Sequence, residues 1–89
     1  MNAEQQELFD LAILRVLDAN RSRFGLGLDG IGHLMAQYGF TAPNKDTLAD
    51  HVDYLMRKAL IEEVVKTMNK ANRAWRITEA GINHVDNHA

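Results

Sequence analysis

The pattern of apolar and polar residues begins with a segment, 3–19, made of good helix formers without Gly or Pro, which predicts a first helix. Its apolar residues sweep about half of the helix circumference, more than the stripe of roughly 100° that one buried face needs. Two interpretations stay open: a central helix in a tight monomer, or a helix that also pairs with a second copy. The homodimer interface would then be formed by Phe9, Ile13, Val16 and Leu17.

A polar, glycine-containing loop, 20–27, separates this segment from a second predicted helix. Asp29 is expected to cap that helix by accepting a hydrogen bond from a free backbone N–H. The helix is expected to end at Tyr38, with Gly39 in the left-handed conformation that often follows a helix.

A third helix is predicted after the short turn 40–43, with Asn44 as its cap. Leu48, Val52 and Leu55 recur at i, i+4 and i+7, which is one core-facing stripe. The close spacing of the second and third helices, within about 29–58, is that of a helix-turn-helix motif.

The apolar alternation then changes to that of strands, predicted at 60–66 and 73–77 and joined by the polar residues 67–72. The short link predicts an antiparallel hairpin, called the wing here and placed at about 60–77. Thr78 is expected to cap a last helix that reaches about residue 86. We therefore predict one domain over 1–89, mainly helical with a small hairpin, in the order helix, helix, helix, strand, strand, helix.

Composition limits the class of protein. The chain of 89 residues contains no cysteine, which excludes disulfides and thiolate metal sites. Neither a signal peptide nor an apolar run long enough to span a membrane is recognisable, so a cytoplasmic protein without a membrane partner is expected. The formal net charge is −2, but residues 61–77 carry four Lys or Arg against two Glu. Local charge decides contact with phosphates.

Motifs that could carry chemistry are weak in this chain. The residues 25–30 match GxGxxG, but no strand precedes them and the chain is too short for a dinucleotide-binding fold. His84 and His88 share a helix face without a convincing third metal ligand, while His33 and His51 are isolated, either one a candidate DNA contact or simply solvent-exposed. We expect no enzyme, no cofactor and no metal site.

Three stretches between Leu14 and Val85 together resemble the winged helix-turn-helix superfamily, in particular the small stand-alone winged-helix proteins of Mu-like phages and prophages. Residues 44–48 resemble a capped recognition helix that starts with a basic residue. Residues 54–61 resemble the LxxxGLI junction into the wing, and 76–81 resemble the LTExG that closes it. Ala59 stands where the junction usually has Gly, so a less sharply left-handed turn is expected.

The resemblance implies double-stranded DNA as partner and a small bacterial or phage transcriptional regulator as function. The start of a recognition helix enters the major groove, and basic groups of a wing suit backbone phosphates. The candidate contacts on the third helix are Asn44, Lys45, Thr47, Ala49 and Asp50. Those on the wing are Lys66, Asn69, Lys70, Asn72, Arg73 and Arg76.

A second hypothesis comes from the third helix, whose polar side carries Asp46, Asp50 and Asp53. Three carboxylates repel phosphates. The alternative function is therefore a winged-helix module that binds protein rather than DNA, for example a phage assembly or adaptor factor.

Overall fold

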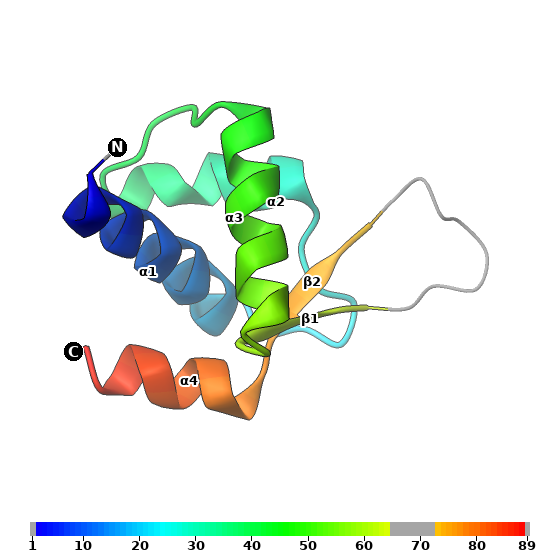
Figure 1. Cartoon of the computed structure of the whole chain (residues 1–89). Helices are drawn as coiled ribbons and strands as arrows, with labels where there is room; N and C mark the ends of the chain where they lie inside the picture. The colour runs from blue at the N-terminus through cyan, green and yellow to red at the C-terminus, as the bar shows by residue number, and fades with distance from the viewer. Residues whose placement is uncertain (1, 65–72, 89) are drawn as a thin grey trace.

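The computed structural model describes residues 2–64 and 73–88, and Figure 1 shows the arrangement of their elements. In chain order these are α1 (Ala3–Ala19), α2 (Leu28–Leu34), the 3-10 helix η1 (Met35–Tyr38), α3 (Lys45–Arg57), β1 (Ile61–Glu63), β2 (Trp75–Ile77) and α4 (Glu79–Asp86). The predicted class and order of elements, mainly helical with one antiparallel hairpin, are confirmed.

α1 is the central helix of the fold. It packs against α2, η1, α3, β2 and α4, whereas the start of the helix, residues 3–8, is exposed. The four residues expected at a homodimer interface are almost completely buried: the exposed fractions are 3% for Phe9, 0% for Ile13, 0% for Val16 and 1% for Leu17. Their assignment to an interface is corrected: these four side chains belong to the core of a single chain, whereas Leu8 of the same helix is 50% exposed.

Side-chain caps fix the starts of α1, α3 and α4. Asn2 and Gln5 form a capping box at α1, and Asn44 accepts hydrogen bonds from two backbone N–H groups at α3. Thr78 accepts from the Gly81 N–H at α4, as predicted. At α2 the prediction was wrong: Gly27 occupies the cap position, and Asp29 lies in the first turn, where the helix dipole favours a carboxylate.

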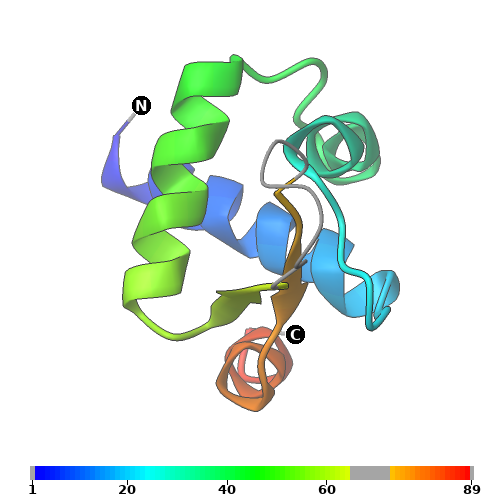
Figure 2. The ribbon, with the colours of Figure 1, turned by 90° about the vertical axis from the view of Figure 1, so that its right-hand side faces the viewer.

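Within the described residues the strands are shorter than predicted, and Leu26 of the loop after α1 pairs with β2. β1 and β2 are antiparallel, with Ile61 opposite Ile77 and Glu62 opposite Arg76. On the other edge of β2, Leu26 and Trp75 exchange backbone hydrogen bonds of 2.8 and 2.9 Å. Figure 2 shows the result: α3 lies on the β1 side of the hairpin and the loop between α1 and α2 on the β2 side.

The junction between α3 and β1 is sharply left-handed. Ala59 has a φ of 59°, so the expectation of a weaker turn at this alanine was wrong. The Thr78 hydroxyl donates to the Ala59 carbonyl at 2.7 Å, and the Thr78 N–H donates to the Leu60 carbonyl. Gly39 also has a positive φ, 92°, as predicted for the residue after η1.

Candidate nucleic-acid interface

The candidate contacts on α3 occupy different environments. The side-chain amide oxygen of Asn44 accepts hydrogen bonds from the backbone N–H groups of Asp46 and Thr47. Lys45 is exposed, and its Nζ lies 2.9 Å from Asp29 Oδ1. The remaining candidates are Thr47 and Ala49, both half-buried, and Asp50, which is exposed.

The exposed side of α3 is acidic in its middle. Asp46, Asp50 and Asp53 are exposed at positions i, i+4 and i+7 of this helix, so they share one face. Asp50 and Asp53 line a surface depression together with Arg57, one turn further along. Three carboxylates on this face oppose a phosphate backbone, and the cations lie toward the two helix ends.

The described wing arginines are already paired with carboxylates. Arg76 on β2 donates through Nε to Glu62 on the facing strand β1. Arg73 donates through Nε and Nη2 to the two carboxylate oxygens of Glu63, both at 3.0 Å. The hydrogen bonds from Arg73 lower the pKa of Glu63, and the same contact raises the pKa of Arg73.

Arg73 is held more firmly than Arg76. Its guanidinium carbon lies 5.0 Å from the centre of the Trp75 ring, which is buried and donates its indole N–H to the Met56 sulfur. Arg73 therefore combines a bidentate pair with a contact on an aromatic face. The other predicted wing contacts, Lys66, Asn69, Lys70 and Asn72, lie outside the described residues.

A histidine treated as isolated on sequence grounds has a partner far along the chain. His51 on α3 and Asp10 on α1 share a hydrogen bond of 2.6 Å between Nδ1 and Oδ1, and both side chains are more than four-fifths buried. The His51 ring packs on Phe9. Burial raises the pKa of the Asp10 carboxyl, although the hydrogen bond from His51 acts against this. The pair joins α1 to α3.

The weaker motifs receive structural explanations. Within the GxGxxG match, Gly25 has a φ of 69°, and a Cβ there would lie 2.6 Å from the Trp75 carbonyl oxygen. The rings of His84 and His88 lie 4.3 Å apart on α4. Over residues 2–64 and 73–88, no group of three or more His, Cys, Asp or Glu is placed to hold a metal ion.

None of the helices in the described part combines the length and apolar character needed to cross a membrane.

Comparison with protein-family models, with curated proteins and with solved structures finds no match to this chain.

Proposed function

We propose that this chain is a DNA-binding winged-helix protein, acting as a small transcriptional regulator of a bacterium or phage. One observation carries the proposal: the segment that contains α3 and the wing differs in charge from the rest of the chain. Residues 45–76 hold seven Lys or Arg against five Asp or Glu, whereas the other residues hold three against seven. A positively charged region next to an exposed helix suits a duplex.

The paired arginines are compatible with this role, because their ion pairs are exposed. The side chains of the Arg76–Glu62 pair are 46% and 49% exposed, and those of Arg73–Glu63 are 50% and 37% exposed. Exposed pairs contribute only about 0–1 kcal/mol, so a phosphate can replace the carboxylate. The glutamates then compete with DNA and make binding moderate in strength and sensitive to salt.

The test is fluorescence anisotropy with a mixture of labelled genomic duplexes between about 50 and 200 mM salt, over which phosphate-dependent binding weakens steeply. We expect binding at the lower salt concentration and a linear fall of log K with log salt. Lys70→Glu combined with Arg73→Glu should abolish it. Arg21→Glu combined with Arg23→Glu makes the same change of net charge in the loop between α1 and α2, and should have a much smaller effect.

Absence of binding at low salt would overturn the DNA proposal. Equal losses in both double variants would mean that net charge alone, rather than the wing, governs binding.

A second candidate function, a protein-binding module, is favoured by the acidic face of α3. Asp46, Asp50 and Asp53 are exposed, and none forms an ion pair with a cation of the described part of the chain. This face would bind a basic segment of a partner. We then expect the chain to bind a deca-lysine peptide even if it does not bind DNA. Asp50→Asn combined with Asp53→Asn should weaken binding of the peptide more than Glu79→Gln combined with Asp86→Asn on α4. Equal weakening by the two pairs would contradict this candidate.

A further inference from the structure

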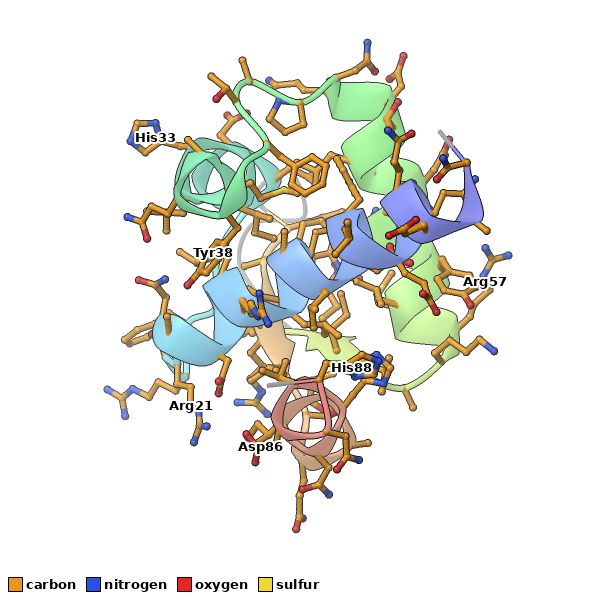
Figure 3. All side chains as sticks on the ribbon, turned by 90° about the vertical axis from the view of Figure 1, so that its left-hand side faces the viewer. Arg21, His33, Tyr38, Arg57, Asp86 and His88 are labelled. Atoms are coloured by element: carbon orange, nitrogen blue, oxygen red, sulfur yellow. The ribbon has the colours of Figure 1, made fainter. Side chains whose placement is uncertain are left out.

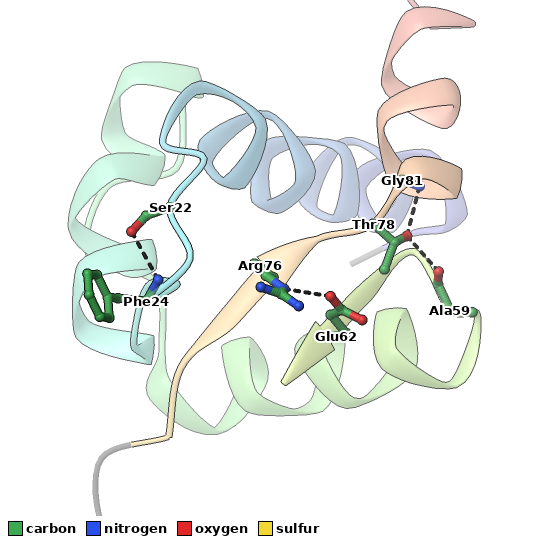
Figure 4. A network of polar contacts seen from close by, with 7 residues as sticks. All are labelled: Ser22, Phe24, Ala59, Glu62, Arg76, Thr78 and Gly81. Atoms are coloured by element: carbon green, nitrogen blue, oxygen red, sulfur yellow. Dashed lines mark hydrogen bonds and ion pairs between the residues drawn. The ribbon is translucent and has the colours of Figure 1, made fainter. Parts of the chain in front are cut away.

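A pocket on the β2 side of the hairpin brings together residues that are distant in sequence. It is a depression of about 380 Å³ between the loop that follows α1, strand β2 and helix α4. Figure 4 shows two of its lining residues, Ser22 on the loop and Arg76 on β2. We call it the arginine pocket, and its lining residues are Arg21, Ser22, Arg23, Arg76, Ile77 and Ile82.

Three guanidinium groups line this pocket, and they retain hydrogen-bond donors. Arg21 donates through Nε and Nη2 to a single oxygen of Asp18, and Arg76 donates through Nε to Glu62. Each guanidinium has five N–H donors, so both keep donors beyond those pairs. Arg23 forms no ion pair with a carboxylate among residues 2–64 and 73–88, and its guanidinium lies over the Phe24 ring at 4.8 Å.

The rest of the lining is a hydroxyl and two apolar side chains. The Ser22 oxygen accepts a hydrogen bond from the Phe24 N–H, which leaves the hydroxyl hydrogen to donate. Ile77 and Ile82 are half-buried and present apolar surface to the pocket. A lining that combines charged donors with hydrocarbon suits a ligand with an anionic group and an apolar body.

We propose that the arginine pocket binds a small organic anion. A phosphate or carboxylate group lies among the guanidinium groups of Arg21, Arg23 and Arg76, whose planar forks suit oxyanions. The apolar body of the ligand lies on Ile77 and Ile82. The volume lies in the range of small-molecule sites, about 300–1,000 Å³, and is too small for a duplex. The pocket shares Arg76 with the candidate DNA contacts of the wing, but binding of a small anion does not depend on the proposed DNA function.

The experiment is an NMR titration of the full chain with phenyl phosphate, following the signals of Ile77 and Ile82. Inorganic phosphate, benzoate and phenol are titrated in parallel. We expect saturable shifts with phenyl phosphate or with benzoate. The probe that binds more tightly identifies whether phosphate or carboxylate is the preferred group. Inorganic phosphate should bind about tenfold more weakly than phenyl phosphate because it lacks the apolar body, and phenol should not bind.

Arg23→Gln should weaken binding of the preferred probe about tenfold, since it removes a charged donor. Arg57→Gln is the matched control: Figure 3 shows Arg57 and Arg21 on opposite sides of the molecule, and Arg57 does not line the pocket. It should leave the affinity within about twofold. Ser22→Ala is a second variant that leaves all guanidinium groups in place, and it should weaken binding by a smaller factor.

Three results would overturn the proposal. These are no saturable shift up to about 10 mM of either organic anion, equal affinity for inorganic phosphate and phenyl phosphate, or equal weakening by Arg23→Gln and Arg57→Gln.

Discussion

The two faces of the β-hairpin differ in polarity and in how tightly their side chains are packed. The inner face is mainly apolar: Ile61 and Trp75 are 2% exposed and pack in the core with α1 and α3, and Glu63, opposite Trp75, is the polar residue on this side of β1. The outer face is polar, and at its centre Glu62 and Arg76 form an exposed ion pair. The same two strands therefore have one tightly packed face and one face whose ion pair can exchange partners.

The two faces of the hairpin separate the contacts that stabilise the fold from those available for binding. Close packing makes the inner face sensitive to a single added methyl group. The outer face contributes little to stability, because exposed ion pairs are weak. Its ion pairs determine which cationic side chains are available to bind a ligand. We expect substitutions on the inner side to change the free energy of unfolding and those on the outer side to change binding.

The largest effect is expected at Gly81, where α4 meets the junction into β1. A Cβ at this position would lie 2.1 Å from the Leu60 carbonyl oxygen, so Gly81→Ala forces α4 away from the sheet. We expect the free energy of unfolding to fall by about 2 kcal/mol or more, measured by urea denaturation. Gly30→Ala on α2 is the matched control: its Cβ would meet only Leu26 at 3.5 Å, and stability should be unchanged or higher. Equal losses in both variants would contradict close packing at Gly81.

The next effect concerns the two exposed ion pairs of the hairpin. Glu62→Gln combined with Glu63→Gln removes the carboxylates that engage Arg76 and Arg73. We expect affinity for duplex DNA at low salt to rise about tenfold, while the unfolding free energy changes by less than about 1 kcal/mol. Glu79→Gln with Asp86→Asn makes the same change of net charge on α4. If both pairs raise affinity equally, release of the wing arginines is not the cause.

A smaller effect is expected at Ala59, whose left-handed backbone is strained by its Cβ. Ala59→Gly should raise the free energy of unfolding by about 0.5–1 kcal/mol, because glycine adopts this conformation without the steric cost. Ala80→Gly, inside α4, should lower it by about the same amount. Thermal unfolding of both variants checks the signs, and a loss at Ala59→Gly would contradict strain at the junction.

The smallest effect concerns the pair that joins α1 to α3. Because burial raises the pKa of Asp10, its contribution to stability is greatest below its ordinary pKa of 3.8 and is lost as the pH rises through the raised value. Asp10→Asn keeps a hydrogen-bonding group beside His51, so its stability relative to the unsubstituted chain should improve as the pH rises from acid toward neutral.

Glu63→Gln should give the opposite trend, since the pKa of Glu63 is lowered and its contribution is lost as the pH falls. Urea denaturation of both variants across this pH range checks the two slopes. Parallel slopes would contradict the assigned directions.

Local chemistry made most of the fold predictable. The span of α1, the caps Asn44 and Thr78 and the left-handed Gly39 all follow from interactions within a few residues, and the structure confirms them. The cap of α2 was missed because Gly27 adopts the cap conformation without a side-chain bond, whereas Asp29 has the more typical residue type.

The candidate site was less predictable, because its properties depend on pairs across the fold. The basic residues of the wing could be read from the chain, but the partners of Arg73 and Arg76 depend on strand register. Arg21 and Arg23 attracted no functional prediction, since only the pairing of Leu26 with Trp75 brings their loop beside β2.

The order and type of the elements follow from the amino-acid sequence, since helix periodicity, capping and turn residues act over short distances. Which surfaces remain available depends on how these elements pack together. This packing buries most of the apolar stripe of α1 within one chain, pairs Asp10 with His51, and places three arginines around one pocket. These outcomes depend on contacts between residues far apart in the chain, and no local pattern encodes such distances.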